Sequence, residues 1–400
     1  MLQPRLAILG GGPIGLDAAL AAADQGWPLT VYEAATHPGA HIRAWGHVRL
    51  FTPWEMNVSP RMASHLAAAG VAVPEGDGCP TGNELCDRLL DPVAALPEVA
   101  PAVHYDARVV SIGRRGLLKH EEIATPQRAQ QPFRLLVAHG DGREEVAEAD
   151  VVLDCTGTYS HPNCTGDGGI PAAGESHLEG RIHRTLPDVA AEEPQWAGQT
   201  VLVVGSGHSA QTAAGELAAL ARQHPGTEVV WAVRSPQPSW GAVVDDPLAE
   251  RAALVERTLA LVGGHEPAVR LEPGVVVDAL AEREGRVAVT LRNGSTAEVV
   301  VDKVLSLTGA VGDNSIYRQL QVHECYATAA PINLSAALLG AAAGDCLQQE
   351  SHGVDVLRNP EPNFFILGSK SYGRVNQFLM RVGWEQVDEV FGALAEANGG

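Results

Sequence analysis

The 400-residue sequence lacks several features, and each absence excludes a class of protein. No apolar run comes near the length that spans a bilayer, so no membrane-spanning helix is expected. The first apolar run, residues 6–9, is too short for the core of a signal peptide, so nothing indicates export. Basic residues are few, 28 against 48 acidic ones. The resulting formal charge of −20 disfavours binding to nucleic acid or to an anionic membrane surface.

Closely spaced cysteine pairs are also missing. The six cysteines are scattered, and no two form a C-x-x-C pair. Without an export signal, this pattern favours reduced thiols and a cytoplasmic protein. His37, His41 and His47 are near one another in sequence, but their spacing matches no standard metal site, and we expect no metal. The length favours two or three domains with a core that needs no disulfides.

What the sequence does contain is a glycine-rich turn at its N-terminus. Residues 6–9 predict a buried parallel strand, and three glycines follow with the spacing G-x-G-x-x-G. An alanine-rich helix is expected over 16–25, ended by Gly26, and a second strand over 29–32. Strand, turn, helix and strand in this order form a βαβ unit, which is the context that gives such a triplet its meaning. The segment therefore predicts a dinucleotide-binding turn.

Each residue of this turn has a physical role. Gly10 permits the tight turn, Gly12 lets the backbone approach a pyrophosphate, and Gly15 lets the helix pack on the strand. The helix N-terminus presents amides and a partial positive charge to the phosphates, and Glu33 is placed to accept the ribose hydroxyls. Further residues expected to contact the dinucleotide bound at this turn are Pro13, Ile14, Ala34, Val109, Thr156 and Gly157.

A long segment, residues 34–60, shows little periodicity but is rich in aromatic residues and histidines. With Trp45, Phe51 and Trp54 present, disorder is a poor explanation, and a loop that packs against a large planar ligand is the better one. Residues 80–90 then predict a helix. Strands are expected over 107–112, 132–139 and 150–153, the charged residues 114–131 are expected at the surface, and residues 160–199 form a crossover.

An internal repeat marks a second domain. Residues 200–204 predict a strand, and Gly205, Gly207 and Ala210 repeat the three small positions of the first turn, with His208 and Ser209 between them. A helix to Arg222 and a strand over 228–233 follow. Where the first unit has an acid, this unit has Arg234 and Ser235. A guanidinium can grip a 2′-phosphate through two hydrogen bonds, so the second nucleotide is predicted to be NADP rather than NAD.

The remaining sequence predicts the return of the chain to the first domain. A helix is expected over 246–261, and strands over 274–280, 286–291 and 297–301 run back towards that domain. Residues 303–310 close this run with a Thr-Gly ending that echoes residues 153–157. The tail holds a strand over 364–368 and an amphipathic helix over 384–394.

This order of parts resembles the two-dinucleotide-domain flavoproteins related to glutathione reductase. Within them, the chain is most similar to the class B flavin-dependent monooxygenases, on residues 50–56 (Leu-Phe-Thr-Pro-Trp-Glu-Met) and 231–240. The resemblance implies an α/β fold of two Rossmann-like dinucleotide-binding domains. An NADP-binding domain over 165–304 would be inserted into an FAD-binding domain made of 1–160 and 305–400.

The resemblance also implies an activity. Hydride from NADPH would reduce FAD, and the reduced flavin would capture O2 and oxygenate a nitrogen, sulfur or arsenic centre of a small molecule. Trp45, Arg49 and Thr52 are then the candidates for the catalytic loop that faces the flavin. Gly368 and Lys370 are expected at FAD as well, with Arg374 as a further cation. The assembly could be a homodimer.

The sequence departs from the class B flavin-dependent monooxygenases at three places. The catalytic asparagine of these monooxygenases is absent at Phe51 and Thr52, their oxygenase signature survives only at residues 174–177, and residues 368–374 replace a Gly-Asp pair. One alternative is an NAD(P)H-dependent FAD reductase or oxidase of the disulfide or electron-transfer type on the same fold. The candidate pairs for that chemistry, Cys79 with Cys86 and Cys155 with Cys164, lack redox-motif spacing. A second alternative is a nucleotide-binding regulator without turnover.

Overall fold

The computed structural model of the protein describes residues 3–340, 347, 349, 351–375 and 378–399. The chain forms two compact units. Unit 1 comprises Met1–Gly46, Thr52–His161 and Val311–Gly400, and unit 2 comprises His47–Phe51 and Pro162–Ala310.

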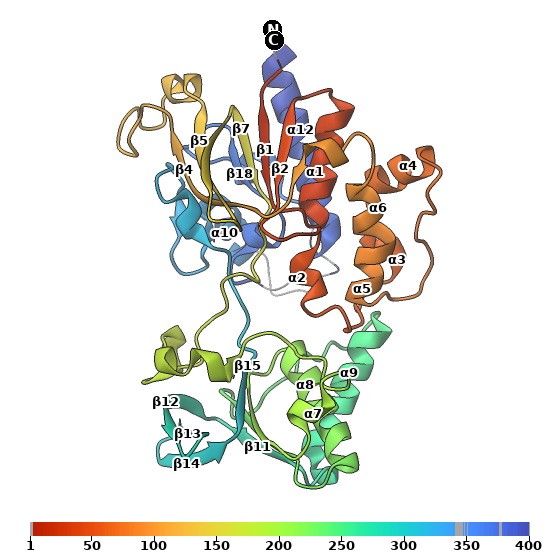
Figure 1. Ribbon diagram of the computed structural model, residues 1–400, viewed down its shortest axis with the longest axis vertical. Coiled ribbons are helices and arrows are strands. Elements are labelled where there is room, and N and C mark those ends of the chain that lie inside the picture. Colours follow the sequence, from red (N-terminus) through yellow and green to blue (C-terminus); the bar gives the residue numbers. More distant parts are fainter. Residues whose placement is uncertain (1–2, 341–346, 348, 350, 376–377, 400) are drawn as a thin grey trace. The chain divides into compact units, whose positions relative to one another are not determined.

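Unit 1 is built on a parallel sheet whose strand order is β18-β7-β1-β2-β3 (Figure 1). Both faces of β1 are covered, which explains its unbroken apolar run. Ala7 and Leu9 pack against an antiparallel sheet, whereas Ile8 faces helix α1. Helix α12 packs beside α1, with the rings of Trp27 and Phe391 5.5 Å apart. The elements are β1 Leu6–Leu9, α1 Pro13–Asp24, β2 Leu29–Tyr32, β3 Val103–His104, β4 Ala107–Arg114, β5 Phe133–His139, β6 Glu144–Ala149, β7 Val151–Asp154, β18 Phe364–Ile366 and α12 Met380–Gly399.

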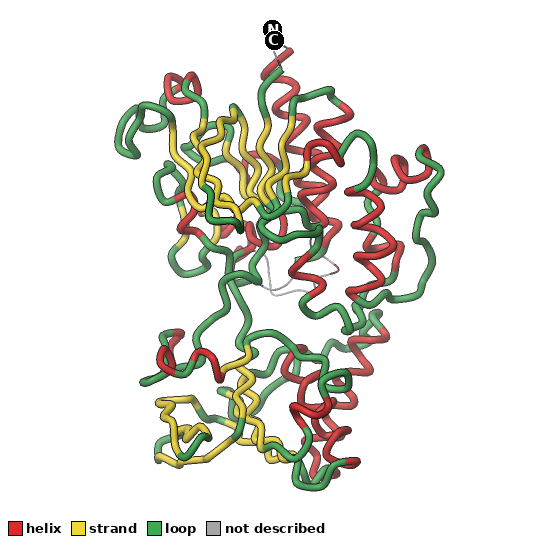
Figure 2. The backbone as a smooth tube through the Cα atoms, viewed as in Figure 1, coloured by secondary structure: helices red, strands yellow, loops and turns green. Residues whose placement is uncertain are grey.

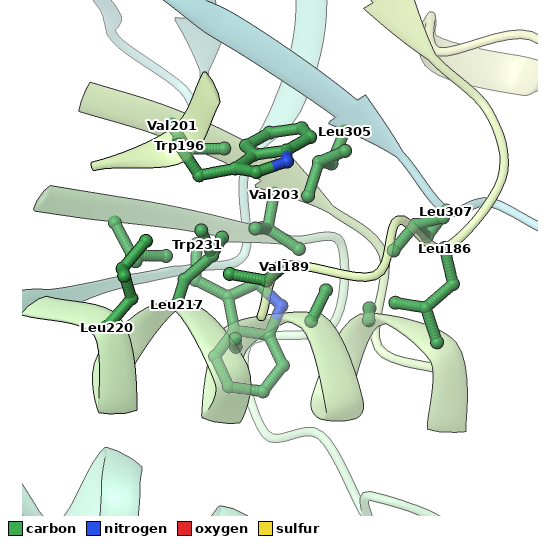
Figure 3. Packing of buried hydrophobic residues seen from close by; sticks show 14 of the residues in the cluster. Leu186, Val189, Trp196, Val201, Val203, Leu217, Leu220, Trp231, Leu305 and Leu307 are labelled. Atoms are coloured by element: carbon green, nitrogen blue, oxygen red, sulfur yellow. The ribbon is translucent and has the colours of Figure 1, made fainter. Parts of the chain in front are cut away.

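Unit 2 has the same arrangement as unit 1, a parallel sheet between helices and an antiparallel sheet; Figure 2 shows its strands and helices. Its parallel sheet has the order β11-β10-β9-β15-β8. Trp231 and Val203 lie in a core against α8 on one face (Figure 3), and Leu202 and Val304 lie in a second core against β12–β14 on the other. The elements are β8 Ile182–His183, β9 Thr200–Val204, α8 His208–Gln223, β10 Glu228–Val233, α9 Ala249–Ala260, β11 Val269–Pro273, β12 Val276–Arg283, β13 Arg286–Arg292, β14 Thr296–Val301 and β15 Lys303–Ser306. The predicted α/β class with two Rossmann-like units is confirmed.

The strands after β11 differ from the prediction. β12, β13 and β14 do not run back to unit 1; they form an antiparallel sheet that covers the parallel sheet of unit 2. β15 pairs in parallel with β9, so Leu305 and Ser306, which the sequence placed in the first domain, belong to the sheet of unit 2. Pairing partners distant in sequence decide this, and local periodicity does not report them.

The segment after β2 contains more helix than predicted. Helices α2 and α3 interrupt it, and α4 follows at Pro60. The start of α4 was readable, because Ser59 accepts a hydrogen bond from the Met62 amide and Pro60 occupies the first turn. The remaining elements are α2 Ala40–Arg43, α3 Trp54–Asn57, α4 Pro60–Ala68, α5 Gly82–Leu85, α6 Asp91–Ala94, α7 Glu193–Trp196, β16 Glu324–Cys325, β17 Ala330–Pro331, α10 Ile332–Gly340 and α11 Val354–Leu357.

The charged stretch between β4 and β5 is not wholly at the surface, which corrects a further expectation. Arg114 and Arg128 are buried, and their Nε atoms donate to the Glu361 carboxylate at 2.7 and 2.8 Å. All three side chains are 0% exposed. The backbone amide of Gln321 donates to the same carboxylate at 2.8 Å. A buried carboxylate therefore ties the β4–β5 connection to the segment that precedes β18.

Glu361→Gln should destabilise the protein by about 3–5 kcal/mol, because it leaves two buried guanidinium groups without their counter-charge. Glu298→Gln is the matched control. It removes an exposed carboxylate paired with Arg283, and such a loss costs about 0–1 kcal/mol. Denaturant unfolding of both variants measures the difference, and equal small losses would contradict the role of the buried cluster.

Candidate dinucleotide sites

The first glycine turn has the steric requirements expected of a phosphate-binding turn. Gly10 has φ +99°, and a Cβ there would lie 2.7 Å from the backbone oxygen of Cys155. A Cβ at Gly15 would lie 1.9 Å from the Gly10 oxygen, so helix and strand touch through backbone alone. Gly12 is different, because a Cβ there would meet no atom within 4 Å. Gly10 and Gly15 therefore shape the turn, and Gly12 leaves an open face above it.

That open face fits a pyrophosphate. Gly12 is the N-cap of α1 and no side chain caps the helix. Pro13 has no amide proton, so the amides of Ile14 and Gly15 are the first donors of the helix. Uncapped donors and a helix N-terminus together favour an anion.

Glu33 follows β2 and is buried. Its carboxylate is held by two backbone amides, from Gly11 to Oε2 at 2.6 Å and from Ala35 to Oε1 at 2.8 Å. Each carboxylate oxygen keeps a second lone pair, so the group can still accept hydrogen bonds from a ribose diol. Ala34 lies beside it, half-buried.

Trp45 carries an orphaned donor. Its Nε1 is buried and has no hydrogen-bond partner among the described residues. The indole is confined, because a Cβ at Gly82 would come within 3.0 Å of it, and the ring of Tyr159 lies 6.2 Å away. A buried indole N–H usually finds an acceptor. The unpaired donor therefore fits a ligand with acceptor atoms, such as a flavin.

The other two predicted loop residues lie in different surroundings. Arg49 is exposed and belongs to the His47–Phe51 segment, which packs with unit 2. In that segment, the Phe51 ring meets His208 edge-on at 4.9 Å. Thr52 returns to unit 1, and its hydroxyl donates to Asn57 Oδ1 at 2.8 Å.

Asn57 was missed by the sequence reasoning. It is buried, and its Nδ2 donates to the backbone oxygens of Thr52 and Pro53 at 2.8 and 2.9 Å. It therefore fixes the start of α3. The sequence did offer a signal for this role, since Asn57 is an amide side chain one turn after Pro53.

The carboxyl ends of β7 and β18 meet beside the first turn. Thr156 Oγ1 donates to Asp154 at 2.7 Å, and Gly157 has φ +69°. Gly368 has φ +72°, and a Cβ there would lie 3.1 Å from Ile14. Lys370 is buried, and its Nζ donates a hydrogen bond to Asp154 Oδ2 at 2.6 Å. Two predicted residues point elsewhere: Val109 packs in the core under the β4–β6 sheet, and Arg374 is exposed.

The second turn repeats the geometry of the first. Gly205 has φ +124°, and a Cβ there would lie 2.4 Å from the Leu307 oxygen. Gly207 is an uncapped N-cap with no atom within 4 Å of its Cβ position. His208 begins α8, and burial lowers the pKa of its imidazole. Ser209, in the same first turn, is exposed.

The end of β10 presents the predicted phosphate contacts. Arg234 is exposed and forms no ion pair within the described part of the chain. The Ser235 hydroxyl accepts a hydrogen bond from the Gln237 amide at 3.2 Å. Gln211, which the sequence reasoning missed, is buried and donates to the backbone oxygens of Ser206 and Trp240 at 3.1 and 3.0 Å.

Gly12→Val should abolish flavin retention without unfolding the protein. The position has φ −85° and open space, so a branched side chain fits the protein but fills the space of the pyrophosphate. Gly207→Val is the matched control, since it makes the same change in the second turn and should lose NADPH binding but keep flavin. Flavin absorbance after gel filtration and NADPH titration measure both. Loss of flavin from the Gly207 variant, or its retention by the Gly12 variant, would contradict the assignment of the two turns.

Comparison with known proteins places this geometry in a family. The family model for pyridine nucleotide-disulphide oxidoreductases matches residues 4–327. The chain belongs to the pyridine nucleotide-disulphide oxidoreductase family. Its members are flavoenzymes that use FAD and NAD(P), so the predicted oxidoreductase class and the predicted cofactors FAD and NADP(H) are confirmed. No curated protein matches the chain significantly.

Solved structures with this fold include both reductases and monooxygenases. Bacillithiol disulfide reductase from Bacillus cereus is 19% identical, with a TM-score of 0.71 over 99% of each chain. DfoA from Erwinia amylovora, a cadaverine monooxygenase bound to FAD, is 13% identical, with a TM-score of 0.67 over 100% of this chain and 95% of that one. Thioredoxin reductase from T. acidophilum is 14% identical, with a TM-score of 0.61 over 100% of both. At these identities the likeness shows the fold alone.

No helix among the described residues combines enough length and apolar character to cross a bilayer. No group of three or more histidine, cysteine, aspartate or glutamate side chains in the same residues is arranged to hold a metal ion.

Proposed function

We propose that the protein is an NADPH-dependent flavin monooxygenase that oxygenates a nitrogen, sulfur or arsenic centre of a small molecule. The observation that carries the proposal is the state of the thiols around the first dinucleotide turn. Cys155 is the cysteine beside Gly10, and burial together with Asp154 raises the pKa of its thiol. Burial raises the pKa of Cys86 to about 11. A dithiol relay needs a thiolate of low pKa, so neither cysteine suits that role.

The solved structures support both oxidoreductase types. DfoA is named as a monooxygenase, and it shares the fold over the whole of this chain. The disulfide reductases share the same fold, so the fold itself does not separate the two chemistries. No disulfide joins any two cysteines of the described residues, and Cys346 lies outside those residues. The thiol environment therefore favours the oxygenase.

The residues of this chain would bind and orient the two cofactors. When bound, FAD supplies the hydride acceptor and the centre that reacts with O2. The uncapped start of α1 would hold its pyrophosphate, Glu33 its ribose, and the Trp45 indole N–H an acceptor atom. In unit 2, the uncapped start of α8 would hold the NADPH pyrophosphate and Arg234 its 2′-phosphate.

A second candidate is a reductase of the disulfide or electron-transfer type. One observation favours it: the family model that matches residues 4–327 is that of the pyridine nucleotide-disulphide oxidoreductases. The disulfide type requires a cysteine that forms a thiolate at the flavin, whereas the electron-transfer type does not. Cys155, the last residue before the Thr-Gly turn, is the position to test.

Oxygen should be consumed with NADPH by the purified yellow protein when a soft nucleophile is supplied. The assay follows NADPH and O2 together over a panel of amines, thioethers and trivalent arsenicals, with catalase and a disulfide substrate as comparisons. One substrate oxygenated per NADPH, with little peroxide, is the expected outcome. The Cys155→Ser variant should behave as wild type. NADPH oxidation that needs a disulfide instead of oxygen, and that is lost in Cys155→Ser, would favour the reductase.

Arg234→Ala should raise the Michaelis constant for NADPH by about ten- to a hundredfold and leave that for NADH almost unchanged. A guanidinium paired with the 2′-phosphate contributes roughly 1.5–3 kcal/mol that NADH does not receive. Arg234→Lys should recover only part of the loss, because an ammonium lacks the two-pronged geometry. Arg270→Ala, an exposed arginine on β11, is the matched control. Steady-state reduction with both coenzymes measures this, and equal losses with NADH and NADPH would make Arg234 structural.

A further inference from the structure

An ion pair of Asp154 and Lys370 lies inside unit 1, and the cofactor assignment does not account for it. The Lys370 Nζ donates to Asp154 Oδ2 at 2.6 Å, to Thr156 Oγ1 at 3.1 Å and to the backbone oxygen of Asp313 at 2.8 Å. Both charged side chains are 0% exposed. An ammonium has three N–H donors, so these three acceptors engage all of them. Direct binding of FAD by this ammonium would therefore require one of these bonds to be given up.

The place of the pair in the fold connects it to the flavin turn. Asp154 is the last residue of β7, which lies between β1 and β18 in the sheet. The next residue, Cys155, donates its amide to Leu9 at 2.9 Å, and its oxygen limits the space at Gly10. In open parallel sheets, ligands bind at these carboxyl ends of the strands. The pair thus lies one residue from the wall of the dinucleotide turn.

The surrounding residues make room for the lysine and satisfy the aspartate. A Cβ at Gly312 would lie 2.4 Å from the Lys370 Cγ, so any larger residue there would displace the lysine side chain. Asp154 Oδ1 accepts hydrogen bonds from the amide and the hydroxyl of Thr156 at 3.2 and 2.7 Å. The Tyr317 ring lies 5.1 Å from the ammonium. The result is a hydrogen-bonded pair with no net charge of its own. Besides Tyr317, ionisable groups in electrostatic contact with it are the Asp313 carboxylate and the Cys155 thiol.

We propose that this neutral pair is the charge-balancing element of the flavin site and controls the reduction potential of FAD. Lys370 is a positioning residue that acts through Asp154 and Thr156. Reduction adds electrons to the flavin, so a net negative charge nearby disfavours it and a net positive charge favours it. Charges interact strongly where water is excluded, whereas a matched pair largely cancels. The proposal depends on FAD binding at the first turn and is independent of whether the enzyme is an oxygenase or a reductase.

The test uses near-isosteric variants of the FAD-bound protein. Lys370→Met leaves an unpaired carboxylate and should lower the midpoint potential, whereas Asp154→Asn leaves an unpaired ammonium and should raise it. Each shift should be on the order of tenfold in the reduction equilibrium, about 30 mV for a two-electron couple. The double variant should return close to wild type. Dye-coupled titration at pH 6 and pH 8 adds a signature. A buried unpaired acid loses its charge at the lower pH and a buried unpaired amine at the higher one, so the two shifts should be largest at opposite pH values.

Glu361→Gln controls for destabilisation, since it breaks another buried ionic cluster whose partners are Arg114, Arg128 and Gln321, and it should leave the potential unchanged. Single variants that lose flavin while the double variant keeps it at the wild-type potential would also support charge balance. The charge-balance proposal would be overturned if the two single variants shifted the midpoint potential in the same direction or not at all. Loss of flavin from both single variants and from the double variant would overturn it as well. A wild-type protein without FAD would overturn it together with the cofactor assignment. A wild-type protein that binds FAD but does not couple NADPH to oxygen would remove only the oxygenase proposal.

Discussion

The close backbone approach at the carboxyl end of β1 is the constraint on which unit 1 depends. Gly10 turns so near to Cys155 that a single methyl group would not fit, and Gly15 lies as near to Gly10. These contacts bring the N-terminus of α1 to the strand ends with no side chain in between. The amides that can bind a phosphate are therefore exposed by the same packing that joins helix and sheet.

Unit 2 meets the same constraint with different residues. Gly205 approaches Leu307 as Gly10 approaches Cys155, and Gly207 leaves the same open face as Gly12. In both units the parallel strands are covered by helices on one face and by an antiparallel sheet on the other. The two turns thus have the same backbone geometry at these positions. The residue after the second strand differs, the buried Glu33 in one unit and the exposed Arg234 in the other, and we propose that this difference selects the nucleotide.

Two groups of buried charged side chains in unit 1 are joined by ion pairs. Lys370 is matched by Asp154, and Glu361 is matched by Arg114 and Arg128, with all five side chains excluded from solvent. Removing one member of such a group leaves an uncompensated charge, so each group holds together segments distant in sequence. Lys370 follows β18, and its ammonium links the end of β7 to Asp313, close to the point at Val311 where the chain re-enters unit 1. A lysine that looks like a surface charge in the sequence is therefore part of the interior.

The sequence by itself determined the parts whose physics is local. The glycine spacing, the alanine-rich helix and the acid at Glu33 lie within one βαβ unit, and the structure has each of these elements there. The same holds for the second turn and for Arg234 at the end of β10. Tertiary structure alone decided the pairing of β15 with β9, the burial of Arg114 and Arg128, and the contacts of Lys370. Periodicity and turn residues report only the neighbours of a residue along the chain. The partner of a buried charge or of an added strand comes from a segment a hundred or more residues away, as with Lys370 and Asp154, and is chosen by packing.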